Sequence, residues 1–211
     1  MEFLILLITS LVAASIPAFV RTKRLIIEVI TILAVTIQVL MVALLASKVA
    51  SVGTITYSPY LALDSLGAIF ACVLALIGSM AAFYSIGYLR EETKHAVIGM
   101  SRVRQFYVLF HLFLFSMFTA IFTTHPILMW ISVEATTLST VFLISFYGKP
   151  ITIEAAWKFF IINSVALLLG FLGTLIFMAT PAHFEGQWFF ANGAHPSPEL
   201  LKIAFILVLI G

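Results

Sequence analysis

The chain has 211 residues, of which 63% are hydrophobic and only 9% are charged, whereas about a quarter of the residues in soluble domains are charged. This composition excludes a soluble domain and indicates an integral membrane protein. The net charge of +2 gives no support for nucleic-acid binding, and the only cysteine, Cys72, lies in an apolar run. The sequence therefore offers no disulfide, no CxxC zinc site and no thiolate set for an iron–sulfur cluster.

Membrane spans are the first elements that the sequence predicts, because a helix needs about 20 apolar residues to cross the hydrocarbon core. We predict an all-α polytopic helix bundle with six full transmembrane helices and the start of a seventh, at approximately 3–20, 25–46, 64–89, 105–123, 127–147, 154–179 and 199–211. The first run has no basic residue before it and three after it, which favours a retained helix over a secretory signal.

The basic residues lie in alternate connections and predict the orientation. Basic clusters follow the first and third spans, Lys149 follows the fifth, and Lys48 is the exception after the second. Since Lys and Arg in short loops favour the cytoplasm, we expect the N-terminus to face away from it. The connection over residues 180–198 has no Lys or Arg, and we expect it to lie along the opposite membrane surface through its aromatic residues, Trp188, Phe189 and Phe190.

Local signals refine these elements. Pro126, in the short THP turn between the fourth and fifth spans, suits a first helical position and makes those two helices antiparallel neighbours. Asp64 is expected to cap the third span, and Glu28 to pair with Arg24 near the start of the second. Small residues form stripes that permit close helix packing in the third span (Gly67, Ala71, Ala75, Gly78, Ala82) and in the sixth (Ala166, Gly170, Gly173).

Glu134 is the main candidate for function, because it lies near the middle of the apolar stretch HPILMWISVEATTLSTVFLISFYG. A charge at the bilayer centre costs at least about 2.5 kcal/mol, so it needs a partner, water or a functional role. No basic residue lies three or four positions away on its own helix, so its partner comes from another helix unless it is protonated. Thr137 shares its face, and such hydroxyls hold water or pass protons. The alternative is a neutral Glu that hydrogen-bonds between helices, beside Ser and Thr that bond their own backbone.

Three further polar residues lie within the spans. Lys158 follows Glu154 by four residues, which fits a helix ion pair or a snorkelling lysine, or else a desolvated lysine that exchanges protons near neutral pH. His111 is expected to make an interhelical hydrogen bond, with a proton-relay role as the alternative, and Asn163 to support helix packing. The candidate ion-translocation residues are therefore Glu134, Lys158, His111 and Thr137, and we expect no catalytic, metal or cofactor site.

The seventh apolar segment, ELLKIAFILVLIG, provides about 12 residues, or about 18 Å of helix, little more than half of the hydrocarbon thickness. Helix carbonyls that end inside lipid cost several kcal/mol each unless protein covers them. We therefore expect the sequence to be the front part of a longer protein or one half of a split one.

A family resemblance is carried by two strings, SVEATTLSTVFLISFYGKPITIEAAWKFFIINSVALLLGFLGTLIF from Ser132 to Phe177 and the earlier LALDSLGAIFACVLALIGSMAAFYSIGYLR. Both resemble the antiporter-like membrane subunits of complex I and of group 4 membrane-bound hydrogenases, especially component F of hydrogenase 4. An isolated Glu, the adjacent ATTLS and the EAAWK helix start follow in the family's order and at its distances. The likeness covers most of the chain after about residue 60.

This resemblance implies a subunit of about fourteen helices built from two inverted five-helix repeats, each with a broken helix along a polar path. In the family, the glutamate that matches Glu134 tunes a lysine on the broken seventh helix, and the pair takes part in moving protons or sodium ions. This sequence stops within the first half of that helix, and Lys202 does not match the lysine. We accordingly divide the chain into residues 1–60, with two helices and an outer loop, and 61–211, an antiporter-like repeat truncated in its broken seventh helix.

The first functional hypothesis is a proton- or sodium-translocating membrane-arm subunit of an oxidoreductase complex in a prokaryotic cytoplasmic (inner) membrane. It implies other membrane-arm subunits and a peripheral redox arm as partners. Iron–sulfur clusters and nickel–iron or flavin centres are then expected only in those partners. The second hypothesis is a subunit of a multi-subunit sodium/proton antiporter without redox chemistry, since one fold serves both uses. The third is a non-translocating scaffold chain.

Overall fold

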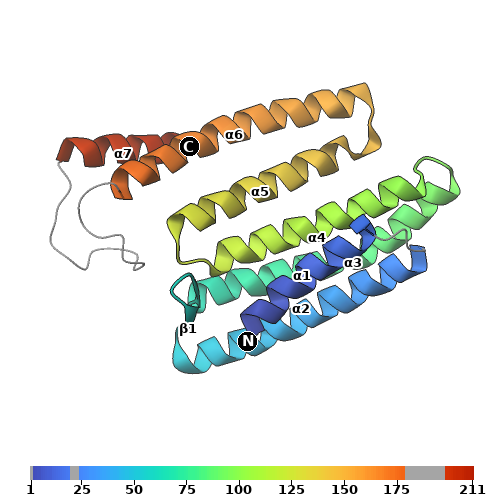
Figure 1. Cartoon of the computed structure of the whole chain (residues 1–211), viewed down its shortest axis with the longest axis horizontal. Helices are drawn as coiled ribbons and strands as arrows, with labels where there is room; N and C mark the ends of the chain where they lie inside the picture. Colours follow the sequence, from blue (N-terminus) through green and yellow to red (C-terminus); the bar gives the residue numbers. More distant parts are fainter. Residues whose placement is uncertain (1, 20–23, 179–197) are drawn as a thin grey trace.

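The computed structural model describes residues 2–19, 24–178 and 198–211 as a set of helices with one small β-hairpin (Figure 1). The helices are α1 (Glu2–Phe19), α2 (Arg24–Val52), α3 (Ser65–Lys94), α4 (Met100–Phe122), α5 (Pro126–Ile144), α6 (Pro150–Met178) and α7 (Pro198–Ile210), with a short 3₁₀ helix, η1 (Ser145–Tyr147), after α5. The hairpin pairs β1 (Ile55–Ser58) with β2 (Leu61–Leu63). Each predicted apolar run has become one helix, so the predicted helical character of the chain is confirmed.

The chain is an integral membrane protein. Five described helices, α2 to α6, are long and apolar enough to cross a membrane, and α1 is a shorter apolar helix. Their outward side chains are large and apolar, for example Leu33, Phe70, Met80 and Leu168, as expected of a surface that faces lipid or neighbouring membrane subunits. A count of six full spans requires α1 to cross as well, and this stays a prediction.

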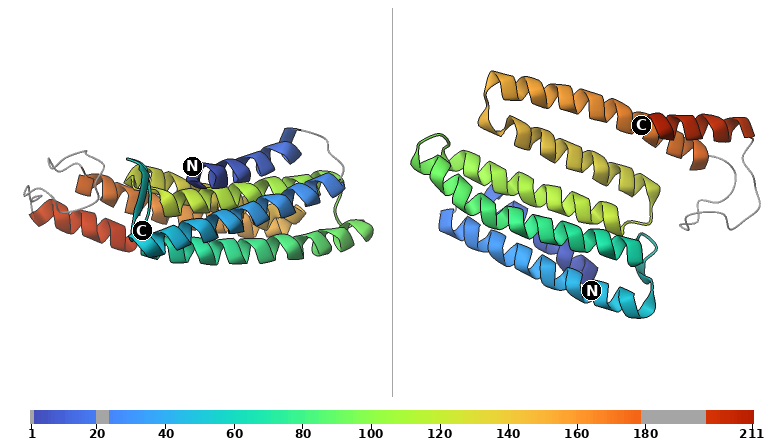
Figure 2. Two further views of the ribbon diagram at one scale, coloured as in Figure 1. Left: turned by 90° about the horizontal axis from the view of Figure 1, so that it is seen from below. Right: turned by 180° about the vertical axis from the view of Figure 1, so that it is seen from behind.

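The helices run along one common direction and alternate in sense (Figure 1). α1 packs on α2 and α4, α2 packs on α3, and α4 packs on α3 and α5. α5 and α6 extend as a layer from the side of the α1–α4 bundle, and α7 packs on α6 (Figure 2). The connections over residues 95–99 and 145–149 lie at one end of the bundle, and the hairpin and the turn over residues 123–125 lie at the other (Figure 1). We call the first the basic end and the second the hairpin end.

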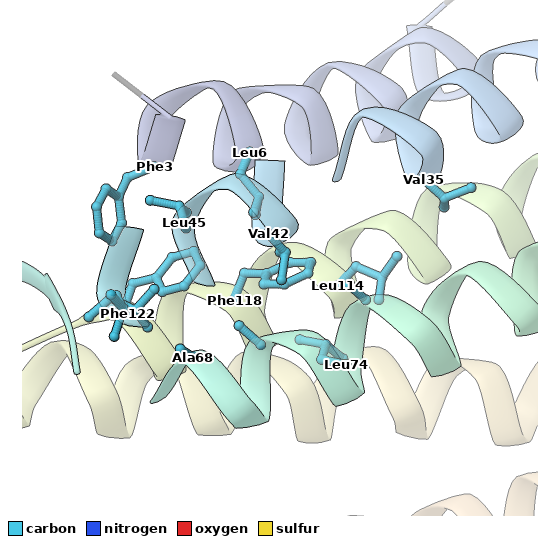
Figure 3. Close-up of a cluster of buried hydrophobic side chains, with 14 of the residues drawn as sticks. Phe3, Leu6, Val35, Val42, Leu45, Ala68, Leu74, Leu114, Phe118 and Phe122 are labelled. Atoms are coloured by element: carbon cyan, nitrogen blue, oxygen red, sulfur yellow. The ribbon is translucent and has the colours of Figure 1, made fainter. Parts of the chain in front are cut away.

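The hydrophobic core lies inside the α1–α4 bundle. Phe3 and Leu6 of α1 meet Val42 of α2 and the rings of Phe118 and Phe122 of α4 (Figure 3). The Phe3 ring packs edge-on against Phe122 with the ring centroids 5.2 Å apart, a favourable geometry for aromatic pairs. In contrast, few residues of α5 and α6 are buried. The part of the chain that carries Glu134 is therefore the least enclosed part of the fold.

Several local predictions are confirmed. α5 begins at Pro126, and α4 and α5 are antiparallel neighbours. The Asp64 carboxylate accepts a hydrogen bond of 2.7 Å from the backbone N–H of Gly67 and so caps α3. The two small-residue stripes lie at helix contacts: a Cβ at Gly78 would lie 3.0 Å from Leu114 of α4, and a Cβ at Gly173 would lie 2.7 Å from the Ala204 carbonyl oxygen of α7.

The hairpin is an element that was not predicted, since the sequence indicates only an outer loop between α2 and α3. Its tip is tied to the turn between α4 and α5, because the Tyr60 carbonyl accepts the Thr124 backbone N–H at 3.0 Å and the Pro59 carbonyl accepts the Thr124 hydroxyl at 2.7 Å. The hairpin thereby joins the end of α2 to the start of α5. The predicted surface position of Trp188, Phe189 and Phe190 lies outside the described residues.

Candidate functional site

Glu134 lies on the side of α5 that faces α6, about two turns from the helix start at Pro126. Its side chain is half-buried, and the Ser164 hydroxyl on α6 donates a hydrogen bond of 2.9 Å to Glu134 Oε1. Within the described ranges no Lys, Arg or His forms an ion pair with it. Its partner therefore comes from another helix, as predicted, but that partner is a hydroxyl and not a cation.

A second polar contact joins α5 and α6 on the hairpin side of Glu134. Trp130 Nε1 donates to Thr174 Oγ1 at 3.0 Å, and the indole ring lies against Gly170, where a Cβ would come within 2.6 Å of it. The absence of a side chain at Gly170 is thus what lets the indole lie against α6. Together, the Trp130 and Ser164 contacts fix the register of the two helices around the carboxylate.

The hydroxyl groups beside Glu134 bond their own helix. Thr137 is buried and donates to the Val133 carbonyl at 3.3 Å, while Thr136 and Thr140 donate to carbonyls at 2.6 and 2.8 Å. This arrangement matches the alternative in which Ser and Thr satisfy their own backbone. Each hydroxyl oxygen still has acceptor capacity toward a water or an ion, but in the structure none donates to Glu134.

Ser164 is the residue of this site that sequence reasoning misses. The available signal was depth, because Glu134 lies about three helical turns before the connection over residues 145–149 and Ser164 about four turns after it, on two antiparallel helices. Which polar residue faces α5 depends on packing that the sequence does not show. The neighbouring Asn163, expected to support packing, makes no side-chain hydrogen bond to any described residue.

Lys158 is not brought to Glu134. Its ammonium pairs with Glu154 at 2.5 Å on the exposed side of α6, where the two side chains are 71% and 64% exposed. This geometry matches the expected ion pair one turn apart on a helix. The pair lies toward the basic end of α6, nearer to the helix start than Ser164.

His111 is also separate from Glu134. It is fully buried on the side of α4 that faces α2, and its Nε2 lies 3.2 Å from Thr31 Oγ1. The expected interhelical hydrogen bond is thereby confirmed. The proton-relay alternative is not tested by this contact.

Glu28 makes the expected pair with Arg24, at 2.8 Å, and a further pair that sequence spacing did not predict. Arg90 of α3 approaches it with Nη2 at 2.5 Å and with Nε at 3.2 Å from both carboxylate oxygens. The Glu28 side chain is only 4% exposed, so two guanidinium groups offset the cost of burying the carboxylate.

A groove of about 350 Å³ runs between α5 and α6 at the basic end. Its lining includes Arg102, Gly148, Leu138, Phe142 and Trp157. Leu138 lies one turn from Glu134, so the groove ends close to the carboxylate. Among the described residues, no group of three or more His, Cys, Asp or Glu is placed to hold a metal ion.

The arrangement can bind a cation. A carboxylate with one hydroxyl donor retains most of its lone-pair sites, so Glu134 can take a proton, coordinate a sodium ion or pair with a lysine. Its half-buried position gives such a partner access from the uncovered face of α5 and α6.

The comparisons with known proteins relate the chain to antiporter-like membrane subunits. Residues 49–97 match the family described as NADH-Ubiquinone oxidoreductase (complex I), chain 5 N-terminus. The chain is 32% identical over 156 residues to a protein of Methylacidiphilum infernorum named hydrogenase-4 component F homolog, a match that covers 70% of this chain and 33% of that protein. It is also 32% identical over 153 residues to Na(+)/H(+) antiporter subunit A1 of Staphylococcus aureus, covering 71% of this chain and 18% of the antiporter subunit.

The fold matches a solved structure over nearly the whole chain. A chain in the membrane-bound sulfane sulfur reductase, an archaeal respiratory membrane complex, superposes with a TM-score of 0.74 at 14% sequence identity, covering 99% of this chain and 42% of the other. The predicted resemblance to antiporter-like membrane subunits is confirmed. The chain spans about a third of the length of the component F homolog and less than a fifth of the antiporter subunit.

Proposed function

We propose that this chain, as a relative of the antiporter-like membrane subunits, forms the front part of a subunit that moves protons or sodium ions in the membrane arm of an oxidoreductase complex. The observation that carries the proposal is Glu134, a half-buried carboxylate inside an apolar helix whose described partner is the Ser164 hydroxyl alone. A carboxylate in this position is costly and is usually kept for function.

Glu134 acts in this proposal together with a cation from outside the described residues. The family resemblance implies a lysine on the broken seventh helix. A carboxylate near a lysine favours the charged form of that lysine, and loss of the contact releases a proton. Moving one charge against 100 mV costs about 2.3 kcal/mol, which a change of about two units in the pKa of the lysine supplies.

The remaining candidate residues take supporting roles. Ser164 holds the carboxylate toward α6. Thr137 offers an acceptor oxygen one turn from Glu134. Lys158, paired with Glu154, lies on α6 toward the basic end, at the end of the helix that lines the groove between α5 and α6. The groove supports entry of the ion from the basic end.

The wider setting is proposed on the same grounds. The basic end faces the cytoplasm, the N-terminus lies on the opposite side, and α1 is the first of six full spans in a prokaryotic inner membrane. The partners are other membrane-arm subunits and a peripheral redox arm. The iron–sulfur and nickel–iron or flavin centres belong to that arm, and this chain holds no cofactor and is not itself catalytic.

A second candidate is a subunit of a sodium/proton antiporter without redox chemistry. It is favoured by the similarity to antiporter subunit A1, which has the same identity as the component F homolog over a similar length. The third candidate, a scaffold chain, is favoured by the lack of a cation beside Glu134 within the described ranges.

Inverted membrane vesicles that contain the native complex separate these candidates. If the proposal is right, ion uptake begins when an electron donor and acceptor are added and stops when electron flow is blocked. Uptake that follows an imposed sodium gradient without any donor indicates the antiporter. A Glu134→Gln complex that assembles and keeps its ion uptake per turnover unchanged indicates the scaffold, and it contradicts both transport functions.

A further inference from the structure

A second group of polar side chains, four of them buried, lies between α2, α3 and α4, away from Glu134. We call it the α2–α4 polar cluster, and it consists of Glu28, Thr31, Arg90, Tyr107 and His111. Glu28 and Thr31 lie one turn apart on α2, and Tyr107 and His111 lie one turn apart on α4, so both pairs share a helix face. The contact between His111 Nε2 and Thr31 Oγ1, at 3.2 Å, joins the two helices at the inner end of the cluster.

The outer end of the cluster reaches the basic end of the bundle. Glu28 is buried there, but its partner Arg90 is 58% exposed. The Tyr107 hydroxyl lies within the electrostatic range of Glu28, Arg24 and Arg90. Ser85 lies close to the same hydroxyl and donates its own proton to the Ala82 carbonyl at 2.8 Å; its oxygen can still accept, but it lies outside hydrogen-bond geometry with Tyr107 Oη. Tyr107 therefore stands between the charged groups and His111.

Two atoms of this cluster lack a partner. Tyr107 and His111 are both fully buried, and neither Tyr107 Oη nor His111 Nδ1 makes a hydrogen bond to any described residue. Buried polar groups are almost always hydrogen-bonded, and where protein groups do not serve them, an ordered water does. If His111 Nε2 carries the proton and donates to Thr31, Nδ1 is a buried acceptor without a partner among the described residues.

The cluster ends at His111. One turn further toward the hairpin end, the buried side chains of Ala34, Val35 and Leu114 are apolar, and Val35 and Leu114 begin the hydrophobic core, at the opposite end from Phe3 and Phe122 (Figure 3). The next buried polar pair, Gln38 with Ser10, lies about two turns beyond Thr31, or about 10 Å along α2. Among the described residues, this apolar layer closes the hairpin side of the cluster, so the polar approach to it is from the basic end.

The depth of His111 relates it to Glu134. His111 lies about three turns before the end of α4 at Phe122, and Glu134 lies about two turns after the start of α5 at Pro126. At about 1.5 Å per residue, these positions are about 17 Å and about 12 Å from the same turn. Because α4 and α5 pack directly on one another, the two side chains lie on neighbouring helices at similar depth.

We infer that water occupies the α2–α4 polar cluster and that His111 is a proton-loading site supplied from the basic end past Glu28 and Tyr107. A water that accepts from Tyr107 and donates to His111 Nδ1 satisfies both atoms. Protonation moves one proton from this water chain to Nδ1, giving an imidazolium, and the same proton returns by the same route, since the apolar layer closes the other side. This inference rests on the proposed ion-moving function. A proton stored at His111 changes the electrostatic field at Glu134.

The test combines a density map with one isosteric variant in the intact complex. A map that resolves ordered water is expected to show a water within hydrogen-bond distance of both Tyr107 Oη and His111 Nδ1. Tyr107→Phe removes only the hydroxyl, and the rate of proton uptake by the working complex is expected to fall by roughly tenfold. Tyr84→Phe is the matched control on the exposed side of α3, and it is expected to leave uptake unchanged.

Two further variants, His111→Gln and Glu134→Gln, keep the outcomes separate. His111→Gln retains an amide donor for Thr31 but holds no proton, so it is expected to slow uptake as Tyr107→Phe does while the complex still assembles. A dry cluster, or normal uptake in the Tyr107→Phe complex, overturns the inference. If uptake is normal in Tyr107→Phe but lost in Glu134→Gln, the proposed function stands and only this inference fails; normal uptake in both overturns the function as well.

Discussion

At the scale of single residues, the charged groups of the membrane helices differ in how their charge is balanced. Glu28 is enclosed and paired with two guanidinium groups, while Lys158 is exposed and paired with Glu154. Glu134 alone among these three has a neutral partner, the Ser164 hydroxyl. Because an uncompensated carboxylate in an apolar helix costs several kcal/mol, the difference distinguishes the charge-balanced Glu28 from Glu134, for which we propose a transport role.

The burial of Glu28 and its pairing with two guanidinium groups predict a loss of stability when its charge is removed. Glu28→Gln removes the charge that holds Arg24 and Arg90 at the junction of α2 and α3. We expect the free energy of unfolding to fall by about 1–3 kcal/mol, seen as a lower midpoint of thermal unfolding in mild detergent. The matched control, Glu154→Gln, breaks an exposed pair and is expected to change stability by less than about 0.5 kcal/mol. Equal effects of the two variants would contradict the role given to Glu28.

At the scale of helices and strands, the sequence predicts what depends on local chemistry. The apolar runs, Pro126 at the start of α5 and the Asp64 cap could be read from composition and spacing, because each depends on residues within a few turns. Individual side-chain contacts between helices could not be read in this way. Ser164 beside Glu134 and Arg90 beside Glu28 depend on which helix faces meet in the folded chain. The hairpin was missed although its own pairing is local, because an isolated two-stranded hairpin is marginally stable and the bonds to Thr124 that support this one join segments far apart in sequence.

The small-residue stripe of α6 gives a prediction at this scale. Gly173→Ala places a methyl group 2.7 Å from the Ala204 carbonyl oxygen and 2.8 Å from Val208, so α6 and α7 must separate, at a cost of about 1–3 kcal/mol. Gly87→Ala is the control, because a Cβ at Gly87 meets nothing within 4 Å. It is expected to leave stability unchanged or to raise it by about 0.5–1 kcal/mol through helix propensity. Thermal unfolding of both variants in detergent checks this. A Gly173→Ala protein as stable as the parent would show that α7 does not pack closely on α6.

At the scale of the whole molecule, the enclosed α1–α4 bundle contrasts with the open layer of α5 and α6 (Figure 2). The core lies in the bundle, and the carboxylate lies in the layer. The enclosed bundle therefore lies beside a layer whose outer face is uncovered, and a further cation can reach Glu134 from that face. The component F homolog is about three times longer than the region that this chain matches. This agrees with our proposal that the cation beside Glu134 comes from outside the described residues.

The orientation of the molecule is tested by labelling from one side of the membrane. In a Cys72→Ser background, Lys149→Cys at the basic end is expected to react with a membrane-impermeant maleimide only from the cytoplasmic side. Ser51→Cys, exposed near the hairpin end, is expected to react only from the opposite side. The positive-inside rule is the physical reason. The reverse pattern would place the N-terminus in the cytoplasm and contradict the proposed path from the basic end.

The most direct test of the central claim is the number of ions moved per turnover by the assembled complex carrying Glu134→Gln, with Glu134→Asp and Glu154→Gln as companions. Gln keeps the size of the side chain and accepts from Ser164, but it neither binds a proton nor carries a charge. We predict that Glu134→Gln lowers ion movement per turnover by about tenfold or more, that Glu134→Asp retains part of it, and that Glu154→Gln matches the parent. Ion movement at the parental ratio in the Glu134→Gln complex would contradict the transport role of this chain.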